Sequence, residues 1–148
     1  ARKLMKKRLT LAVAESCTGG LLSSTLTDVP GSSKWFKGGV VAYTNEVKIS
    51  ILGVKTATLK KYGAVSEETA FELAKGVRKK LKTNIGVSVT GLAGPSGGTK
   101  KTAVGTIFIG AYNGKERLVT KLELKGSRVT IKRKAAQAAL RVLKGLLR

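Results

Sequence analysis

Histidine is absent from this chain of 148 residues, and with it goes the commonest general base and metal ligand in proteins. A Ser-His-Asp or Cys-His mechanism is therefore excluded. The chain has a single cysteine, Cys17, so no internal disulfide forms, which is typical of a reducing compartment. Asp and Glu number only eight and are scattered, which disfavours a paired-carboxylate hydrolase or a carboxylate metal site.

Long apolar runs are also missing. The longest candidates, Leu9–Ala14 and Ile107–Ala111, are far too short to span a bilayer. The basic N-terminus lacks the apolar stretch of a secretory signal. We therefore expect a cytoplasmic protein with no membrane partner. Aromatic residues make up 5% of the chain, too few to indicate a surface on which bases stack.

Positive charge is what the chain has in excess, with a formal net charge of +21. Such a charge is compatible with a nucleic acid, an anionic surface or a phosphorylated substrate. The basic residues are dispersed along the sequence without one long tract, which is more typical of a solvated surface. We expect nonspecific binding to polyanions, and we keep nucleic-acid or protein-partner binding as an alternative function.

The hydrophobic pattern predicts one α/β domain over residues 1–148, because 42% of the residues are apolar and no linker divides the chain. Strands are expected at Leu9–Ala14, Gly39–Tyr43, Ile85–Thr90, Val104–Tyr112 and Arg117–Lys125, the last two joined by an Asn113-Gly114 hairpin turn. Helices are expected at 20–29, 46–52, 67–82 and 130–147. This order predicts a three-layer α/β/α sandwich with a mostly parallel mixed sheet and one antiparallel hairpin.

Three unusual segments follow the first three strands: Glu15–Gly20, Tyr43–Lys48 and Gly91–Gly98. Ligands of layered α/β domains gather at the carboxyl ends of the strands. The first segment joins a strand to a helix N-terminus, where free N–H groups can hold a phosphate or an oxyanion. Ser16 and Thr18 can equally be helix caps, and the glycine loop can equally be a connector.

Lysine is the remaining activator for a serine nucleophile. Lys48 lies about one turn into its predicted helix, where the helix dipole and burial can lower its pKa. A neutral lysine can take a proton from Ser16, although an exposed lysine is the simpler interpretation of Lys48 alone. We favour Ser16 over Cys17 because no histidine is present to activate a thiol.

Several motifs together resemble the CinA C-terminal domain, a family of competence/damage-inducible proteins that includes nicotinamide mononucleotide (NMN) amidases. The resemblance covers nearly the whole chain. It rests on five stretches: Leu11–Gly20, Gly31–Phe36, Gly39–Lys48, Gly63–Ser66 and Thr90–Pro95.

The resemblance implies an α/β/α domain, often a homodimer, that hydrolyses the carboxamide of NMN to nicotinic acid mononucleotide and ammonia. It places the nucleophile at Ser16, the base at Lys48 and the motif tyrosine at Tyr43, with no metal or cofactor. The residues expected to bind the nucleotide substrate are Cys17, Thr18, Gly19, Asn45, Thr90, Gly91, Arg128 and Arg133. The backbone N–H groups of Cys17 and Thr18 are expected to form the oxyanion hole.

The sequence also departs from the family pattern. Only about eight residues precede Leu9, whereas the family usually has a longer first helix. The family's Gly-Asp-Arg before the last helix is here Gly126-Ser127-Arg128, and a usual following arginine is Lys132. The molybdopterin-binding-related domain of longer relatives is not in this sequence, so we do not expect its pyrophosphatase chemistry here.

Overall fold

The computed structural model describes all 148 residues. Its strands are β1 (Leu11–Glu15), β2 (Phe36–Val41), β3 (Ile85–Gly91), β4 (Thr106–Tyr112) and β5 (Arg117–Glu123). Its helices are α1 (Arg2–Lys6), α2 (Leu21–Thr27), α3 (Asn45–Leu52), α4 (Thr56–Tyr62), α5 (Glu67–Lys80) and α6 (Arg128–Leu146), with a 3₁₀ turn, η1, at Ser32–Lys34.

The five strands form one open sheet in the order β2-β1-β3-β4-β5. The β1–β2 and β1–β3 pairs are parallel, and the β3–β4 and β4–β5 pairs are antiparallel. Only β4 therefore runs against the other four strands. This confirms the predicted mixed, mostly parallel sheet, with β4–β5 as the antiparallel hairpin.

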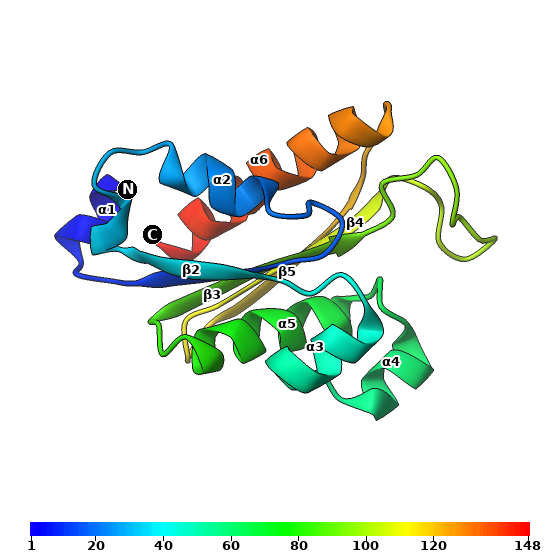
Figure 1. The fold of residues 1–148 in the computed structure, drawn as a ribbon, viewed down its shortest axis with the longest axis horizontal. Helices are drawn as coiled ribbons and strands as arrows, with labels where there is room; N and C mark the ends of the chain where they lie inside the picture. Colours follow the sequence, from blue (N-terminus) through cyan, green and yellow to red (C-terminus); the bar gives the residue numbers. More distant parts are fainter.

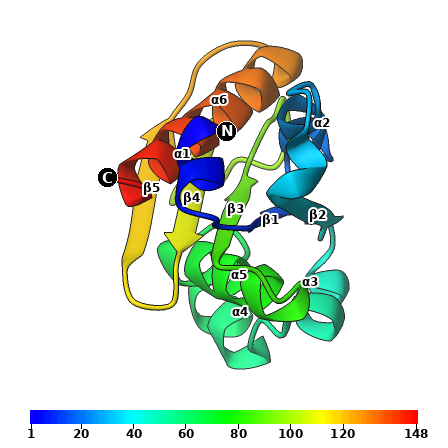
Figure 2. The ribbon, with the colours of Figure 1, turned by 90° about the vertical axis from the view of Figure 1, so that its left-hand side faces the viewer.

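Helices cover both faces of the sheet, so the domain has three layers (Figure 1). Helices α1, α2 and α6 pack on one face, where they enclose the larger apolar core around Leu11 and Val13. Helices α3, α4 and α5 lie on the other face, where Ala12 and Ala14 contact a smaller core. The side view in Figure 2 shows these two layers on either side of the strands.

The position of β1 in the sheet explains why its apolar residues form an uninterrupted run. It is a central strand, and all five of its residues are buried. Alternate side chains point to opposite faces of a strand, so both helical layers need apolar partners from β1. A continuous apolar run is the pattern expected of a strand covered on both faces.

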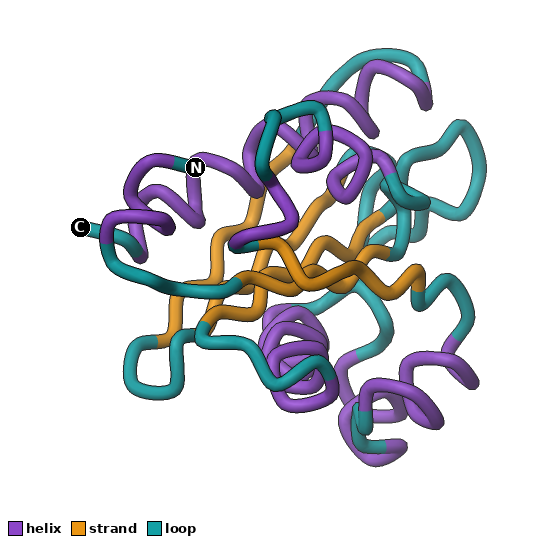
Figure 3. Tube along the Cα trace, turned by 60° about the vertical axis from the view of Figure 1, so that its left-hand side comes forward, coloured by secondary structure: helices purple, strands orange, loops and turns teal.

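Two helices were not predicted, and one strand is shifted. Helix α4 has no side-chain cap and α1 buries only Leu4, so neither carries a clear helical pattern. The predicted strand 39–43 is instead Phe36–Val41, and the chain leaves the ladder before Tyr43. Figure 3 shows the long loop that follows β3, which extends from the body of the domain.

Candidate functional site

Lys48 and Ser16 meet inside the protein. Thr44 caps α3 by accepting a hydrogen bond from the Val47 N–H at 3.3 Å, and Gly53 ends the helix in a left-handed conformation. Lys48, one turn into this helix, is only 2% exposed. Its Nζ lies 3.2 Å from the Oγ of Ser16, which follows β1 directly.

The amine of Lys48 has two further partners, the carbonyl oxygens of Ala42 at 2.9 Å and Tyr43 at 3.2 Å. These carbonyls are available because β2 has already ended. A neutral amine has two N–H donors and one lone pair. If the two donors serve the two carbonyls, the lone pair faces the hydroxyl of Ser16.

Burial lowers the pKa of Lys48 below its ordinary value, because desolvation disfavours the charged amine. The nearby Cys17 thiol acts in the opposite sense, as a smaller effect. The two ion pairs of the structure, Arg117–Glu67 and Lys121–Glu123, do not involve Lys48. No carboxylate is therefore paired with the amine to hold its proton, which suits a general base.

The turn after Ser16 contains two backbone N–H groups that have no partner in another residue. The Ser16 N–H donates to the carbonyl of Val89 at 2.9 Å, and the Gly19 N–H donates to the carbonyl of Ser16 at 3.1 Å. Between them, the N–H groups of Cys17 and Thr18 donate to no other residue. Two unengaged donors next to a nucleophile are the elements of an oxyanion hole.

Cys17 is unsuited to be the nucleophile. Burial raises the pKa of its thiol to about 11, with a further contribution from the charge of Glu15. A thiol with this pKa holds almost no thiolate near neutral pH. The structure therefore favours the hydroxyl of Ser16 over its neighbour.

A cavity of about 290 Å³ opens beside the Ser16–Lys48 pair. The ends of β1, β2 and β3 all contribute to its lining, as the strand-end argument predicted. The predicted site residues that it brings together are Ser16, Cys17, Tyr43, Asn45, Lys48, Thr90, Gly91 and Arg128.

Three predicted substrate-binding residues lie elsewhere. Thr18, Gly19 and Arg133 line a separate cavity of about 460 Å³, together with Lys132. Arg133 is five residues after Arg128 on α6, which turns it by about 140° around the helix axis. The Ser16 cavity is therefore lined by Arg128 and not by Arg133.

Arg128 joins three segments at the cavity. Its Nη1 donates to the carbonyl of Gly94 at 2.6 Å, and its Nη2 donates to the hydroxyl of Tyr43 at 2.9 Å. The first turn of α6 is thereby tied to the glycine-rich loop and to the loop after β2. The hydroxyl of Tyr43 therefore accepts a hydrogen bond from this cation in the structure, and no hydrogen bond joins it to Ser16 or Lys48.

Sequence reasoning missed several residues that line the cavity, including Ala64 and Val65 before α5. The hydroxyl of Thr90 donates to the carbonyl of Ala64 at 2.8 Å, which brings this segment to the site. The segment was among the motifs used for the family resemblance, but it follows no strand. The strand-end argument could not have found it.

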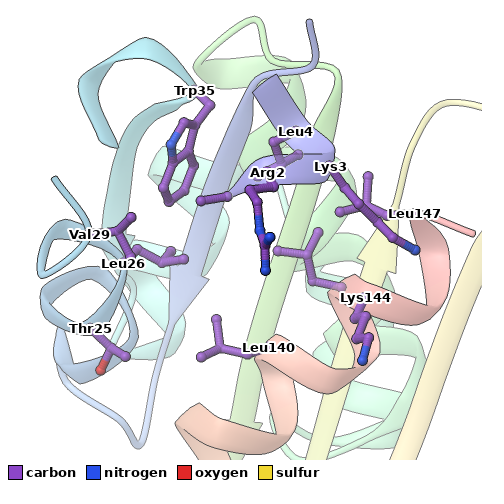
Figure 4. A pocket seen from close by; sticks show the side chains of 12 residues that line it. Arg2, Lys3, Leu4, Thr25, Leu26, Val29, Trp35, Leu140, Lys144 and Leu147 are labelled. Atoms are coloured by element: carbon purple, nitrogen blue, oxygen red, sulfur yellow. The ribbon is translucent and has the colours of Figure 1, made fainter. Parts of the chain in front are cut away.

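A second cavity, of about 520 Å³, lies away from the Ser16–Lys48 pair. Figure 4 shows it among α1, α2 and α6, with apolar side chains such as Leu26, Leu140 and Leu147 around it and Trp35 at one side. It contains no nucleophile with an adjacent base. The structure also has no group of three or more potential metal ligands, and none of its helices has the length and apolarity to cross a membrane.

Comparisons with known proteins identify the family of the chain. Residues 1–147 match the model of the CinA C-terminal domain family. The chain is 51% identical over 137 residues to a CinA-like protein of Kosmotoga olearia, covering 93% of this chain and 33% of that protein. It thus spans about a third of the length of this curated relative.

Solved structures are similar in fold over nearly the full chain. The competence/damage inducible protein CihA from Agrobacterium tumefaciens superposes with a TM-score of 0.94 at 35% identity, covering 99% of this chain and 93% of that one. A competence or damage-inducible protein from Enterobacter asburiae gives a TM-score of 0.95 at 34% identity, covering 99% and 92%. The chain belongs to the CinA C-terminal domain family.

Proposed function

We propose that this domain is an amidase that hydrolyses the carboxamide of NMN to nicotinic acid mononucleotide and ammonia. The observation that carries the proposal is the buried contact of 3.2 Å between Lys48 Nζ and Ser16 Oγ, both of which line one cavity. A serine with an adjacent neutral amine is the Ser–Lys form of an activated nucleophile. The family resemblance supplies the substrate.

In the proposed reaction, each of these groups has one role. Lys48, neutral, takes the proton of Ser16, whose oxygen attacks the carboxamide carbon. The negative charge that forms on the amide oxygen is stabilised by the N–H of Cys17, which lines the same cavity, and by that of the next residue, Thr18, which lies where the turn passes to the neighbouring cavity. Lys48 then gives the proton to the departing ammonia, which leaves an ester on Ser16. Lys48 next takes a proton from a water molecule that hydrolyses this ester, and returns it to Ser16.

The size of the cavity and its one cation support a mononucleotide substrate. Its volume of about 290 Å³ lies just below the roughly 300–1,000 Å³ typical of small-molecule sites, which favours a small ligand. Arg128 lines the same cavity, and a guanidinium binds phosphate through two parallel hydrogen bonds. We therefore place the carboxamide at Ser16 and the 5′-phosphate toward Arg128.

The test is ammonia release from NMN by the wild type and by two variants, Ser16→Ala and Lys48→Met. We expect turnover in the wild type and none above background in either variant. Matched controls are Ser50→Ala and Lys60→Met, which change the same residue types at exposed positions and should leave turnover unchanged. Normal turnover in Ser16→Ala or Lys48→Met would overturn the dyad.

A second substrate tests the phosphate. Nicotinamide riboside lacks the 5′-phosphate and should show a KM at least tenfold higher than that of NMN, because the interaction with Arg128 is lost. Equal KM values for the two substrates would remove the phosphate from the proposal. Turnover of the riboside alone would make the enzyme an amidase with a different substrate.

A further inference from the structure

Glu15, the last residue of β1, is a buried carboxylate that the proposed reaction does not use. Its side chain points to the same face of the sheet as Leu11 and Val13, toward α2, and the residue is only 1% exposed. No lysine or arginine pairs with it. A buried charge without such a partner is costly unless hydrogen bonds replace its hydration.

Four hydrogen bonds provide that replacement. One oxygen of Glu15 accepts from the N–H groups of Gly20 at 3.1 Å and Leu22 at 2.9 Å. The other accepts from the N–H of Ser23 at 2.8 Å and from its hydroxyl at 2.7 Å. The carboxylate thus binds the first turn of α2 and closes a ring around residues 16–19, the segment that carries the nucleophile.

The ring determines which donors stay free. Between residues 16 and 24, every backbone N–H donates to a neighbour or to Glu15 except those of Cys17 and Thr18. The start of α2 is therefore satisfied by the protein itself and is not an open anion site. The two donors that the proposed oxyanion hole needs are the two that Glu15 leaves unengaged.

The backbone of Glu15 is connected to the other half of the pair. Its carbonyl accepts from the N–H of Ala42 at 2.7 Å, and the carbonyl of Ala42 in turn accepts from Lys48. The hydroxyl of Ser23 packs closely against Gly39 on β2, since any side chain at position 39 would overlap it. This close contact confines Ser23. Glu15 is thus connected by hydrogen bonds both to the turn that carries Ser16 and, through Ala42, to the amine of Lys48.

We infer that Glu15 is a positioning residue: its carboxylate holds the β1–α2 turn so that Ser16 stays against Lys48 and the N–H groups of Cys17 and Thr18 stay free. This inference rests on the proposed function for its catalytic consequence. The hold on the turn itself is independent of any substrate.

Glu15→Gln is the informative variant because it keeps the shape and removes the second acceptor. An amide has one oxygen and one NH₂ group. In either orientation of the amide, its NH₂ group faces a backbone N–H of the first turn of α2, and that N–H loses its hydrogen-bond acceptor. Glu123→Gln is the matched control, since Glu123 is exposed and its carboxylate forms an ion pair with Lys121, at 3.4 Å.

The first measurement is NMN turnover. We expect kcat of Glu15→Gln to fall roughly 10²-fold, the size of effect that a misplaced reacting group produces. KM should stay within about threefold, because Arg128, the proposed phosphate ligand, lies outside the turn that Glu15 holds. Glu123→Gln should match the wild type in both constants. Ser23→Ala, which removes one of the four hydrogen bonds, should lower kcat by a smaller factor.

The second measurement needs no substrate. Cys17 is the only thiol of the chain and lies inside the ring, so its alkylation by iodoacetamide reports how well the turn is held. We expect the alkylation rate of folded Glu15→Gln to exceed that of the wild type at least tenfold. A rate profile against pH separates the causes: loss of the charge of Glu15 only moves the thiol pKa, whereas an opened turn also raises the limiting rate at high pH.

The outcomes are distinct. Loss of kcat together with a raised limiting alkylation rate supports the inference. It is overturned if kcat falls without a change in that rate, or if the rate rises while kcat is unchanged. Circular dichroism and the milder Ser23→Ala variant guard against a folding defect. If the wild type releases no ammonia from NMN, the proposed function alone fails, and Cys17 alkylation still decides whether Glu15 holds the turn.

Discussion

The guanidinium of Arg128 donates to the hydroxyl of Tyr43 at 2.9 Å, across 85 positions of sequence. The contact links the start of α6 to the loop after β2, on the wall of the Ser16 cavity. It makes Arg128 a cation that is already oriented before substrate arrives. Orientation before binding reduces the cost of ordering a flexible side chain.

Tyr43→Phe should therefore act on binding more than on chemistry. One hydrogen bond is worth roughly 1 kcal/mol, or about fivefold in KM, and kcat should change little. Steady-state kinetics with NMN measure both constants. A large loss of kcat with unchanged KM would instead make Tyr43 a proton relay.

Arg128→Met should raise the KM for NMN by more, at least tenfold, because it removes the only arginine of the cavity. The KM for nicotinamide riboside should be unaffected, since that substrate has no phosphate. Arg133→Met is the matched control, because Arg133 lines the separate cavity with Thr18 and Gly19. An equal effect of the two variants would show that the substrate reaches both cavities.

The pH dependence follows from Lys48. Burial places the pKa of Lys48 below its usual value of 10.5, and the neutral amine is the active form. We expect kcat/KM to rise with pH through that lowered pKa, and the rising limb to reach a plateau before pH 10.5. A rate profile that rises only above pH 10.5 would contradict a lowered pKa.

The free energy of unfolding should also depend on the protonation of Lys48. Between the folded and unfolded pKa values of Lys48, the unfolded state binds more protons, so the free energy of unfolding rises with pH in that window. Below the folded pKa, both states carry the proton and Lys48 adds no slope. Urea unfolding at a series of pH values should show this rise in the wild type and its absence in Lys48→Met.

Cys17 should be dispensable for turnover. The proposed oxyanion donor is its backbone N–H, so Cys17→Ala should keep kcat within about threefold. The wild-type thiol, with its pKa raised to about 11, should react with iodoacetamide very slowly at pH 7. Loss of activity in Cys17→Ala with activity retained in Ser16→Ala would make the thiol the nucleophile.

The net charge of +21 predicts weak binding to polyanions without sequence preference. Affinity for a DNA duplex should fall steeply as salt rises, because lysine and arginine displace counterions. Ser16→Ala should bind equally well, which fluorescence anisotropy can measure. Tight binding that persists at high salt would favour the nucleic-acid alternative.

Much of the fold could be predicted because its strongest patterns are local. The buried run of β1, the caps Thr44 and Ser66, and the turn at Asn113 are visible in short windows of sequence. Helix α4 could not be predicted, since its start at Lys55 has no side-chain cap. Its position depends on packing against α5.

The sequence alone determined the type of chemistry available. Without histidine and with few carboxylates, lysine was left to activate a serine, and the positions of Ser16 and Lys48 after strands implied that they could meet. These conclusions depend on which residues are present and on the order of the predicted strands along the sequence. Both can be taken from the chain before it folds.

Only the tertiary structure decided how the groups are arranged. It buries Lys48 against Ser16, turns Arg128 toward the cavity and Arg133 away from it, and encloses Glu15 beneath the turn. Burial lowers the pKa of Lys48, and the packing of α6 decides which of the two arginines faces the Ser16 cavity. Neither effect can be inferred from local sequence, because each depends on which distant segments pack together.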